Sequence, residues 1–225
     1  MRKAGFLISA AFVLAACASV SADILWHQPY DGASPQVTSQ KYTDAIAQSV
    51  YLFDDFFVGS GGWTVNRVTV YGLETGSSAA NAGVFLKLSA IAGINAPGQV
   101  FTGTQVGNNL VFNLPDVYLT PSYQWLTAFV ERPMSGGSWR WNTTTPITVN
   151  QFVVHNPGGG LGLGTSPVLG SKLPQLAKKP KDLSFTIEGT QGCCDDCVIP
   201  ELPSLMLALT ALPAVAFAAR YRRAK

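Results

Sequence analysis

The chain contains few of the residues on which hydrolytic and metal-dependent enzymes depend. Among its 225 residues there are two histidines, His27 and His155, and neither lies in a zinc-binding spacing such as HExxH. No GxSxG sequence is present to hold a nucleophilic serine on a strand-to-helix turn. We therefore expect no catalytic residues and a protein that is not an enzyme. A secreted hydrolase is kept as an alternative, and it requires two acidic residues, or a set built around a histidine, that meet in one cleft.

Positive charge is scarce outside the terminal segments. Residues 23–190 contain nine lysines and arginines and ten aspartates and glutamates, so the net charge of this segment is about −1. A surface that binds nucleic acid needs Lys and Arg concentrated on one face. The sequence therefore excludes nucleic acid as a partner class.

Helical patterns are also missing from residues 23–190. No stretch of ten or more residues there combines a helical stripe of apolar residues with caps at its ends. Short runs that alternate in polarity or are rich in β-branched and aromatic residues occur instead at 65–71, 84–88, 125–130 and 183–188, with Gly and Pro between them. This pattern predicts an all-β fold, an antiparallel β-sandwich or jelly-roll-like domain over residues 23–190.

One long hydrophobic run is present, near the C-terminus. Residues 202–219 carry no charge, and as a helix they would measure about 27 Å, enough to cross a bilayer. Pro213 interrupts the middle of the run, and a buried core helix is the alternative. We predict a transmembrane helix at 202–219 with the domain outside, because four cations that favour a cytoplasmic tail follow it, Arg220, Arg222, Arg223 and Lys225.

The residues around this helix resemble the PEP-CTERM sorting signal of bacterial exported proteins, in which a Pro-Glu-Pro-like motif precedes a transmembrane helix and an Arg-rich end. The resemblance covers residues 200–225, and Leu202 stands where the family normally has proline. It implies sorting at the membrane and cleavage by the family's membrane protease, the exosortase. An uncleaved C-terminal anchor is the alternative. The matching residues are Pro200, Glu201, Pro203, Ser204, Arg222 and Arg223.

The N-terminus has the composition of an export signal. Two basic residues precede an apolar stretch at 4–16, and small residues follow it as a cleavage site. Residues 1–22 are therefore predicted to be a signal peptide, with a mature chain that begins at Asp23. Residues 14–17 also match a lipobox, which would make Cys17 a lipidated first residue, and the sequence leaves both cleavage sites open.

Three cysteines lie in the linker at residues 191–199, between the domain and the sorting signal. A disulfide from either of the first two to the third is less strained than one between the adjacent pair. A structural zinc site is an alternative, in which Asp195 and Asp196 complete the ligands. Cysteines just before the helix also resemble the related MYXO-CTERM signals. The sequence leaves the pairing open for Cys193, Cys194 and Cys197.

The order of segments in the domain resembles a β-sandwich domain that is common in PEP-CTERM proteins. The matches are mostly aromatic-rich strands and cover most of residues 51–190. The resemblance implies an exported cell-surface or extracellular-matrix protein, with no catalytic residues to transfer and with extracellular polysaccharide as an associated partner. The matching segments are 51–58, 61–72, 123–130, 139–141 and 182–190.

Two groups of residues are candidates for ligand binding. Trp139 and Trp141 flank Arg140, and in a strand the two rings share one face about 6 to 7 Å apart, which suits a platform for stacking a sugar. Such a platform would make the domain a carbohydrate-binding or adhesive module, and the alternative places both rings in the core. Asp54 and Asp55 are candidate Ca²⁺ ligands at a strand end. As adjacent strand residues they point to opposite faces, so they cannot act together as a glycosidase pair.

Overall fold

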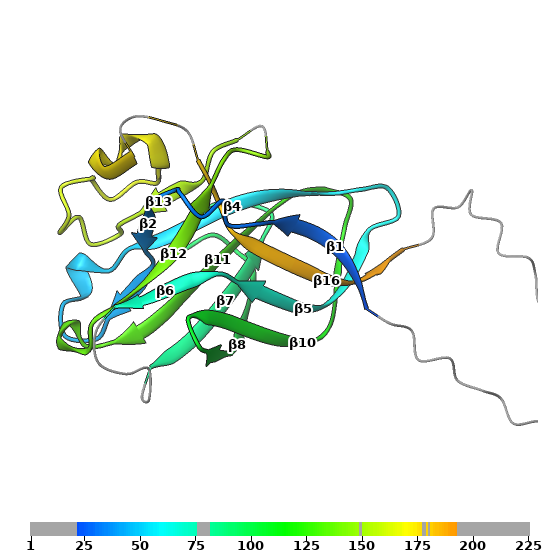
Figure 1. Cartoon of the computed structure of the whole chain (residues 1–225), viewed down its shortest axis with the longest axis horizontal. Coiled ribbons are helices and arrows are strands. Elements are labelled where there is room, and N and C mark those ends of the chain that lie inside the picture. The colour runs from blue at the N-terminus through cyan, green and yellow to red at the C-terminus, as the bar shows by residue number, and fades with distance from the viewer. Residues whose placement is uncertain (1–21, 76–81, 149, 177–178, 180, 193–225) are drawn as a thin grey trace, which may run out of the picture.

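The computed structural model of the chain describes residues 22–75, 82–148, 150–176, 179 and 181–192. These residues form three antiparallel sheets that pack together (Figure 1). The all-β, antiparallel fold expected from the sequence is therefore confirmed. The signal peptide up to residue 21, the three linker cysteines and the whole sorting signal lie outside the described residues.

The first sheet brings together the two ends of the described chain. Its strand order is β1, β16, β5, β10, β9, and each neighbouring pair is antiparallel. Because β1 begins where β16 ends, Asp23 lies opposite Gly189, and both ends leave from one end of the molecule (Figure 1). The strands are β1 (Asp23–Gln28), β16 (Phe185–Gln191), β5 (Trp63–Val70), β10 (Asn109–Leu119) and β9 (Thr104–Val106).

The second sheet has β4 and β11 at its centre. Its order is β14, β13, β4, β11, β7, β8, and β3 joins β11 as the one parallel pair among the described strands. The strands are β14 (Val168–Leu169), β13 (Val153–His155), β4 (Tyr51–Val58), β11 (Ser122–Arg132), β7 (Gly83–Ser89), β8 (Gln99–Thr102) and β3 (Gln40–Tyr42).

The third sheet continues two strands of the first, because β6 follows β5 after one residue and β15 precedes β16 in the same way. Three backbone hydrogen bonds close this junction in a ring: Tyr71 N donates to Ser184 O, Ser184 N to Asn142 O, and Asn142 N to Tyr71 O, at 3.1, 2.9 and 3.0 Å. The ring joins the first sheet to the third. The strands are β12 (Ser138–Thr144), which pairs with β2 (Gln36–Thr38), β6 (Gly72–Thr75) and β15 (Asp182–Leu183).

The main core contains apolar side chains from all three sheets. Successive side chains of a strand point to opposite faces of the sheet. In β4, Leu52 and Phe56 therefore face this core, whereas Tyr51 and Phe53 face a smaller cluster on the other side of the sheet. Full burial of a Leu or Phe side chain stabilises the fold by about 1.5–3 kcal/mol. The largest fully buried side chains are Trp139, Trp141, Phe53, Phe56, Phe112, Phe152 and Phe185.

Helical structure in the described residues is limited to four 3-10 turns of three residues each. This agrees with the lack of helical stripes in the sequence of the domain. The turns connect strands and supply few side chains to the core. They are η1 (Ile46–Gln48), η3 (Met134–Gly136), η4 (Gly170–Lys172) and η5 (Pro174–Leu176).

Candidate functional site

β12 places Trp139 and Trp141 on its inner face and Arg140 on its exposed face. Both indole rings are fully buried, with ring centroids 6.1 Å apart and ring planes inclined by 48°. Trp139 Nε1 donates to Asn108 O and Trp141 Nε1 donates to Ser184 O, both at 2.9 Å. A sugar stacks on an open aromatic face, and neither ring offers one. The pair therefore lies in the core, as the alternative interpretation held, and does not form the stacking platform.

Asp54 and Asp55 lie in the middle of β4, and both side chains are fully buried. Their hydrogen bonds go to different segments. Asp54 Oδ2 accepts the backbone N–H of Leu183 at 2.5 Å, whereas Asp55 accepts hydrogen bonds from Thr148 Oγ1 at 3.1 Å and Asn150 Nδ2 at 2.8 Å. Thr148 and Asn150 therefore cover Asp55, and β15 lies against Asp54.

A third carboxylate, that of Asp182 in β15, joins these two. Gln28 Nε2 donates to Asp54 Oδ2 at 3.4 Å and to Asp182 Oδ2 at 3.3 Å. Thr148 Oγ1 lies 3.1 Å from Asp55 Oδ1 and 3.2 Å from Asp182 Oδ2. We call Asp54, Asp55 and Asp182 the buried carboxylate cluster. No sequence pattern singled out Asp182, which stands only as the first residue of the matching segment 182–190.

The described side chains provide no cationic partner for this cluster, since their salt bridges join other residues. Burial, and then the charge of Asp182, raises the pKa of Asp54 well above its usual value. Burial also raises the pKa of Asp182, although N–H groups of Thr148 and Ile147 offset part of the effect. Buried carboxyl groups without a countercharge favour the protonated form. We therefore expect Asp54 to hold a proton in the folded state.

The Ca²⁺ prediction at Asp54 and Asp55 has limited geometric support. The described residues include no group of three or more His, Cys, Asp or Glu side chains arranged to hold a metal ion. N–H and O–H donors occupy carboxylate oxygens that a cation would need. One oxygen of the cluster, Asp182 Oδ1, is buried without a hydrogen-bond partner. Calcium binding at these residues stays a prediction.

Replacing Asp54 by asparagine is expected to change how the free energy of unfolding depends on pH. The pKa of Asp54 in the folded state lies above its unfolded value of about 3.9, so between these two values the folded state binds more protons than the unfolded state. Relative to Asp54→Asn, wild type is then most stable below about pH 4 and loses stability as the pH rises. Urea unfolding at several pH values, followed by Trp fluorescence, measures this difference.

Asp116→Asn, at an exposed position of β10, is the control for the loss of one negative charge. Parallel pH profiles for wild type and Asp54→Asn would contradict the raised pKa of Asp54. An increase in wild-type stability on addition of Ca²⁺ at neutral pH, lost in Asp54→Asn, would instead support the calcium prediction.

Both histidines bond to groups other than carboxylates. His27 Nδ1 lies 2.8 Å from Thr186 Oγ1. His155 Nδ1 accepts the Ile94 N–H at 3.0 Å, and its Nε2 lies 3.1 Å from Thr165 O. Burial lowers the pKa of His155, with the Thr165 bond opposing the effect. Neither described histidine is therefore paired with an acid, as the hydrolase alternative would require.

Two concave features of the described surface lie away from the buried carboxylate cluster. A cavity of about 210 Å³ is lined mainly by the aliphatic side chains Val37, Val50, Val154, Leu161, Leu163 and Leu173. A groove of about 460 Å³ lies beside β1 and is lined by Asp23, Ile24, Leu25, Trp26, Phe57, Gly59, Trp63 and Gln191. Neither holds a pair of acidic residues, so neither is the cleft that a hydrolase would need.

Comparisons of the chain with protein-family models, with curated proteins and with solved structures gave no match. Among the described residues no helix is long and apolar enough to cross a membrane, and the predicted span at 202–219 lies outside them. The resemblance to PEP-CTERM proteins therefore depends on the residues quoted from the sequence. What the structure shows is an all-β chain with three antiparallel sheets packed together.

Proposed function

We propose that this chain is an exported cell-surface or extracellular-matrix protein without enzymatic activity, sorted through its PEP-CTERM-like C-terminal segment. In this proposal residues 1–22 direct export, and a β-sandwich domain at residues 23–190 lies outside the cytoplasmic membrane. Residues 202–219 hold it there until an exosortase-like membrane protease cleaves near Pro200. Extracellular polysaccharide is its associated partner at the cell surface.

The observation that carries the proposal is the common exit of both ends of the domain (Figure 1). Asp23 begins β1 and pairs with Gly189 of β16. At the C-terminal end of the described residues, Gly192 N donates to Gly62 O at 2.8 Å, directly before β5 begins. A domain whose ends leave together can be tethered at that end while the rest of its surface faces outward. This supports a domain held close to a membrane by its flanking segments.

The polar interior of the domain supports a role without catalysis. The buried carboxylate cluster accepts hydrogen bonds from the backbone of β15 and of Ile147 and Thr148, so it holds these parts of the chain together. Carboxylates that act on a sugar flank a cleft large enough for the substrate. The cluster has the acidic groups of such a site but is fully buried.

Deletion of residues 200–225 is expected to abolish the membrane-bound stage of the protein, so that it is recovered from the medium and not from the cell envelope. The deletion removes the predicted membrane helix and the cations after it, so nothing in the proposed sorting signal would retain the chain. The measurement is the intact mass of the protein recovered from both fractions. Wild type is expected to yield a chain that begins at Asp23 and ends near Pro200.

The matched variant for this experiment replaces Pro200 and Glu201 by alanine and keeps the helix and the cations. It is expected to end at Lys225 and to stay in the membrane fraction, because the protease no longer recognises it while the helix still anchors it. Wild type that itself ends at Lys225 would contradict processing and favour a permanent anchor. A lipid-sized addition on Cys17 would contradict the cleavage site before Asp23.

A further inference from the structure

Four segments of the described chain meet at the end where β1 begins and β16 ends. Gln191 and Leu119 both pair with Trp63, from opposite sides of β5. Ser122, at the start of β11, pairs with Val58 at the end of β4. The turns that join β4 to β5 and β10 to β11 therefore lie beside the two ends of the described chain. We call this region the exit end, residues 22–26, 57–64, 117–124 and 189–192.

Large apolar and aromatic side chains are exposed at the exit end. The exposed fractions are 66% for Ile24, 48% for Phe57 and 46% for Tyr123. The rings of Phe57 and Tyr123 are cross-strand neighbours with centroids 5.2 Å apart. Phe57 also lines the groove beside β1 together with Ile24 and the partly buried Trp26. These four side chains form one surface from β1 to β11, which we name the aromatic exit surface.

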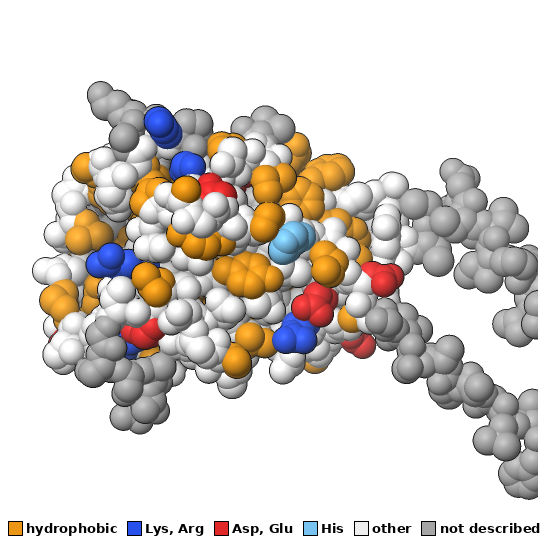
Figure 2. Space-filling model, viewed as in Figure 1, with side chains coloured by type: hydrophobic (Ala, Val, Ile, Leu, Met, Phe, Trp, Pro, Cys, Tyr) orange, Lys and Arg blue, Asp and Glu red, His pale blue; other side chains and the backbone are white. Residues whose placement is uncertain are grey.

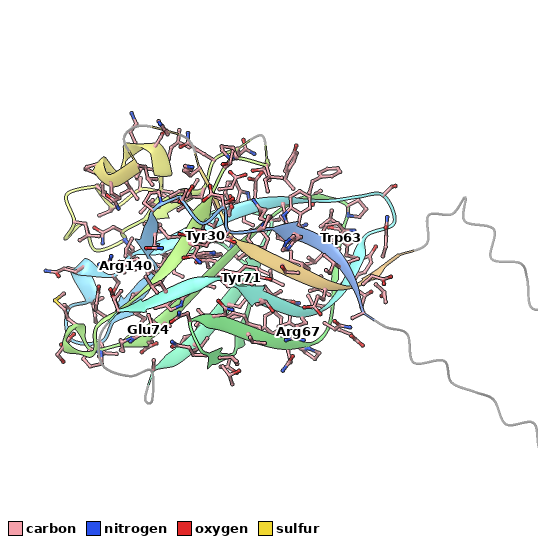
Figure 3. The ribbon with its side chains drawn as sticks, in the orientation of Figure 1. Tyr30, Trp63, Arg67, Tyr71, Glu74 and Arg140 are labelled. Carbon is pink, nitrogen blue, oxygen red and sulfur yellow. The ribbon has the colours of Figure 1, made fainter. Side chains whose placement is uncertain are left out.

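The exit end carries almost no charge, and what it carries is negative. Its four segments contain one charged residue, Asp23, and no lysine or arginine. Figure 2 shows acidic side chains and few basic ones on the visible face near the two ends of the described chain. In Figure 3, Trp63 lies toward the exit end, whereas Glu74 and Arg140 lie toward the other end. Attraction to anionic lipid therefore cannot drive binding here, and apolar and aromatic contacts must supply the affinity.

The chain between the domain and the predicted helix keeps the exit end close to the bilayer. Nine residues separate Gly192 from Leu202, and fully extended they would span only about 35 Å. A domain of this length has a diameter of about 40 Å. The tether is thus shorter than the domain is wide, and it starts at the exit end. The exit end is therefore the part of the domain that meets the membrane most readily.

We infer that the aromatic exit surface rests on the headgroup region of a zwitterionic bilayer, which has no net charge. This inference depends on the proposed function, since it takes residues 202–219 as the membrane anchor. Aromatic rings bury their apolar parts at the boundary between headgroups and acyl chains, while a Tyr hydroxyl stays hydrated. The Trp26 indole N–H already donates to Gln28 Oε1 at 2.9 Å, so its burial leaves no donor unpaired. Contact through Ile24, Trp26, Phe57 and Tyr123 orients the domain with its opposite end toward the medium.

The test uses the full chain reconstituted in phosphatidylcholine vesicles, made either with ordinary or with brominated acyl chains, because bromine quenches Trp residues that reach the bilayer. The background variant is Trp26→Phe, which removes the native Trp of the surface. Tyr123→Trp then places a reporter on the surface, and Met134→Trp places one at the exposed turn after β11. The length of β11 separates these two positions by roughly 35 Å.

Brominated lipid is expected to remove most of the emission added by Tyr123→Trp and none of that added by Met134→Trp, at low and at high salt alike. Wild-type emission should also fall, and the quenched part should disappear in Trp26→Phe. Flotation of the vesicles reports insertion of the anchor independently.

Three outcomes would overturn the inference. Insertion without quenching at position 123 removes the contact and leaves the proposed anchor intact. Failure of the chain to float with the vesicles contradicts both the anchor and the contact. A change in Trp26 emission on addition of soluble polysaccharide, with no quenching by brominated lipid, would assign the surface to sugar instead.

Discussion

Replacing Trp141 by alanine is expected to lower the free energy of unfolding by about 3–5 kcal/mol, a large part of the stability of an ordinary domain. The ring is fully buried, with its centroid 6.1 Å from that of Trp139 and 6.5 Å from that of Phe185. Its indole N–H donates to Ser184 O, in the backbone ring that joins the first and third sheets. Alanine therefore leaves a cavity at this junction and removes one of its hydrogen bonds. Urea unfolding followed by far-ultraviolet circular dichroism measures the loss.

Two further variants identify the cause of this loss. Trp141→Phe keeps most of the apolar volume and removes the N–H, so a smaller loss of about 1–2 kcal/mol is expected. Tyr118→Ala removes an aromatic ring at an exposed position of β10 and should change stability by about 0.5 kcal/mol or less. A loss for Trp141→Ala as small as that for Tyr118→Ala would contradict the burial of Trp141 and restore the sugar-stacking prediction.

The second large effect is expected at the ion pair between Arg132 and Glu74. Arg132 Nη1 donates to Glu74 Oε1 and Nη2 donates to Oε2, both at 2.8 Å. The exposed fractions of the two side chains are 3% and 14%, so the pair is largely out of water. It joins β11 of the second sheet to β6 of the third. Arg132→Met leaves the Glu74 carboxylate without its countercharge, and a loss of about 3–5 kcal/mol is expected.

A double-mutant cycle tests whether the loss comes from the unpaired carboxylate. The double variant Arg132→Met and Glu74→Met should recover most of the stability, because a packed apolar pair of similar volume carries no desolvated charge. Lys41→Met at the more exposed pair with Glu131 is the control and should cost no more than about 1 kcal/mol. A double variant as unstable as Arg132→Met alone would show that packing of the apolar parts of the two side chains, and not their charge, holds the two sheets together.

Alternation in the sequence predicts which residues of a strand face the core. Leu183, Phe185 and Ile187 alternate with polar residues, and all three are fully buried in β15 and β16. The runs at 65–71 and 125–130 likewise lie largely within β5 and β11. The pattern did not reveal β1 or the eleven-residue β10, in which Pro115 interrupts the alternation. It also missed short strands such as β2, β3 and β9, which have three residues each. Three residues show too little alternation to be distinguished from a turn.

The candidate site residues show where local pattern stops being informative. Spacing in a strand predicts that Trp139 and Trp141 share a face, and the structure agrees, but it does not indicate which face is covered. Adjacent positions predict that Asp54 and Asp55 diverge. Burial of both follows because residues distant in the sequence, Leu183 of β15 on one face and Thr148 and Asn150 on the other, cover β4 at this point. Nothing in the sequence connects Asp182 with either residue.

Composition and local pattern are enough to predict the all-β class, the near-neutral charge of the domain and the terminal patterns on which the export proposal depends. Each of these is a property of composition or of residues close together in the chain, where period and spacing decide the outcome. Three features follow only from the fold: the tryptophan pair is buried, three carboxylates meet with no cationic partner among the described side chains, and both ends of the described chain lie beside exposed aromatic side chains. Burial and proximity depend on which distant segments cover a given face, and pairing between strands far apart in the sequence determines that.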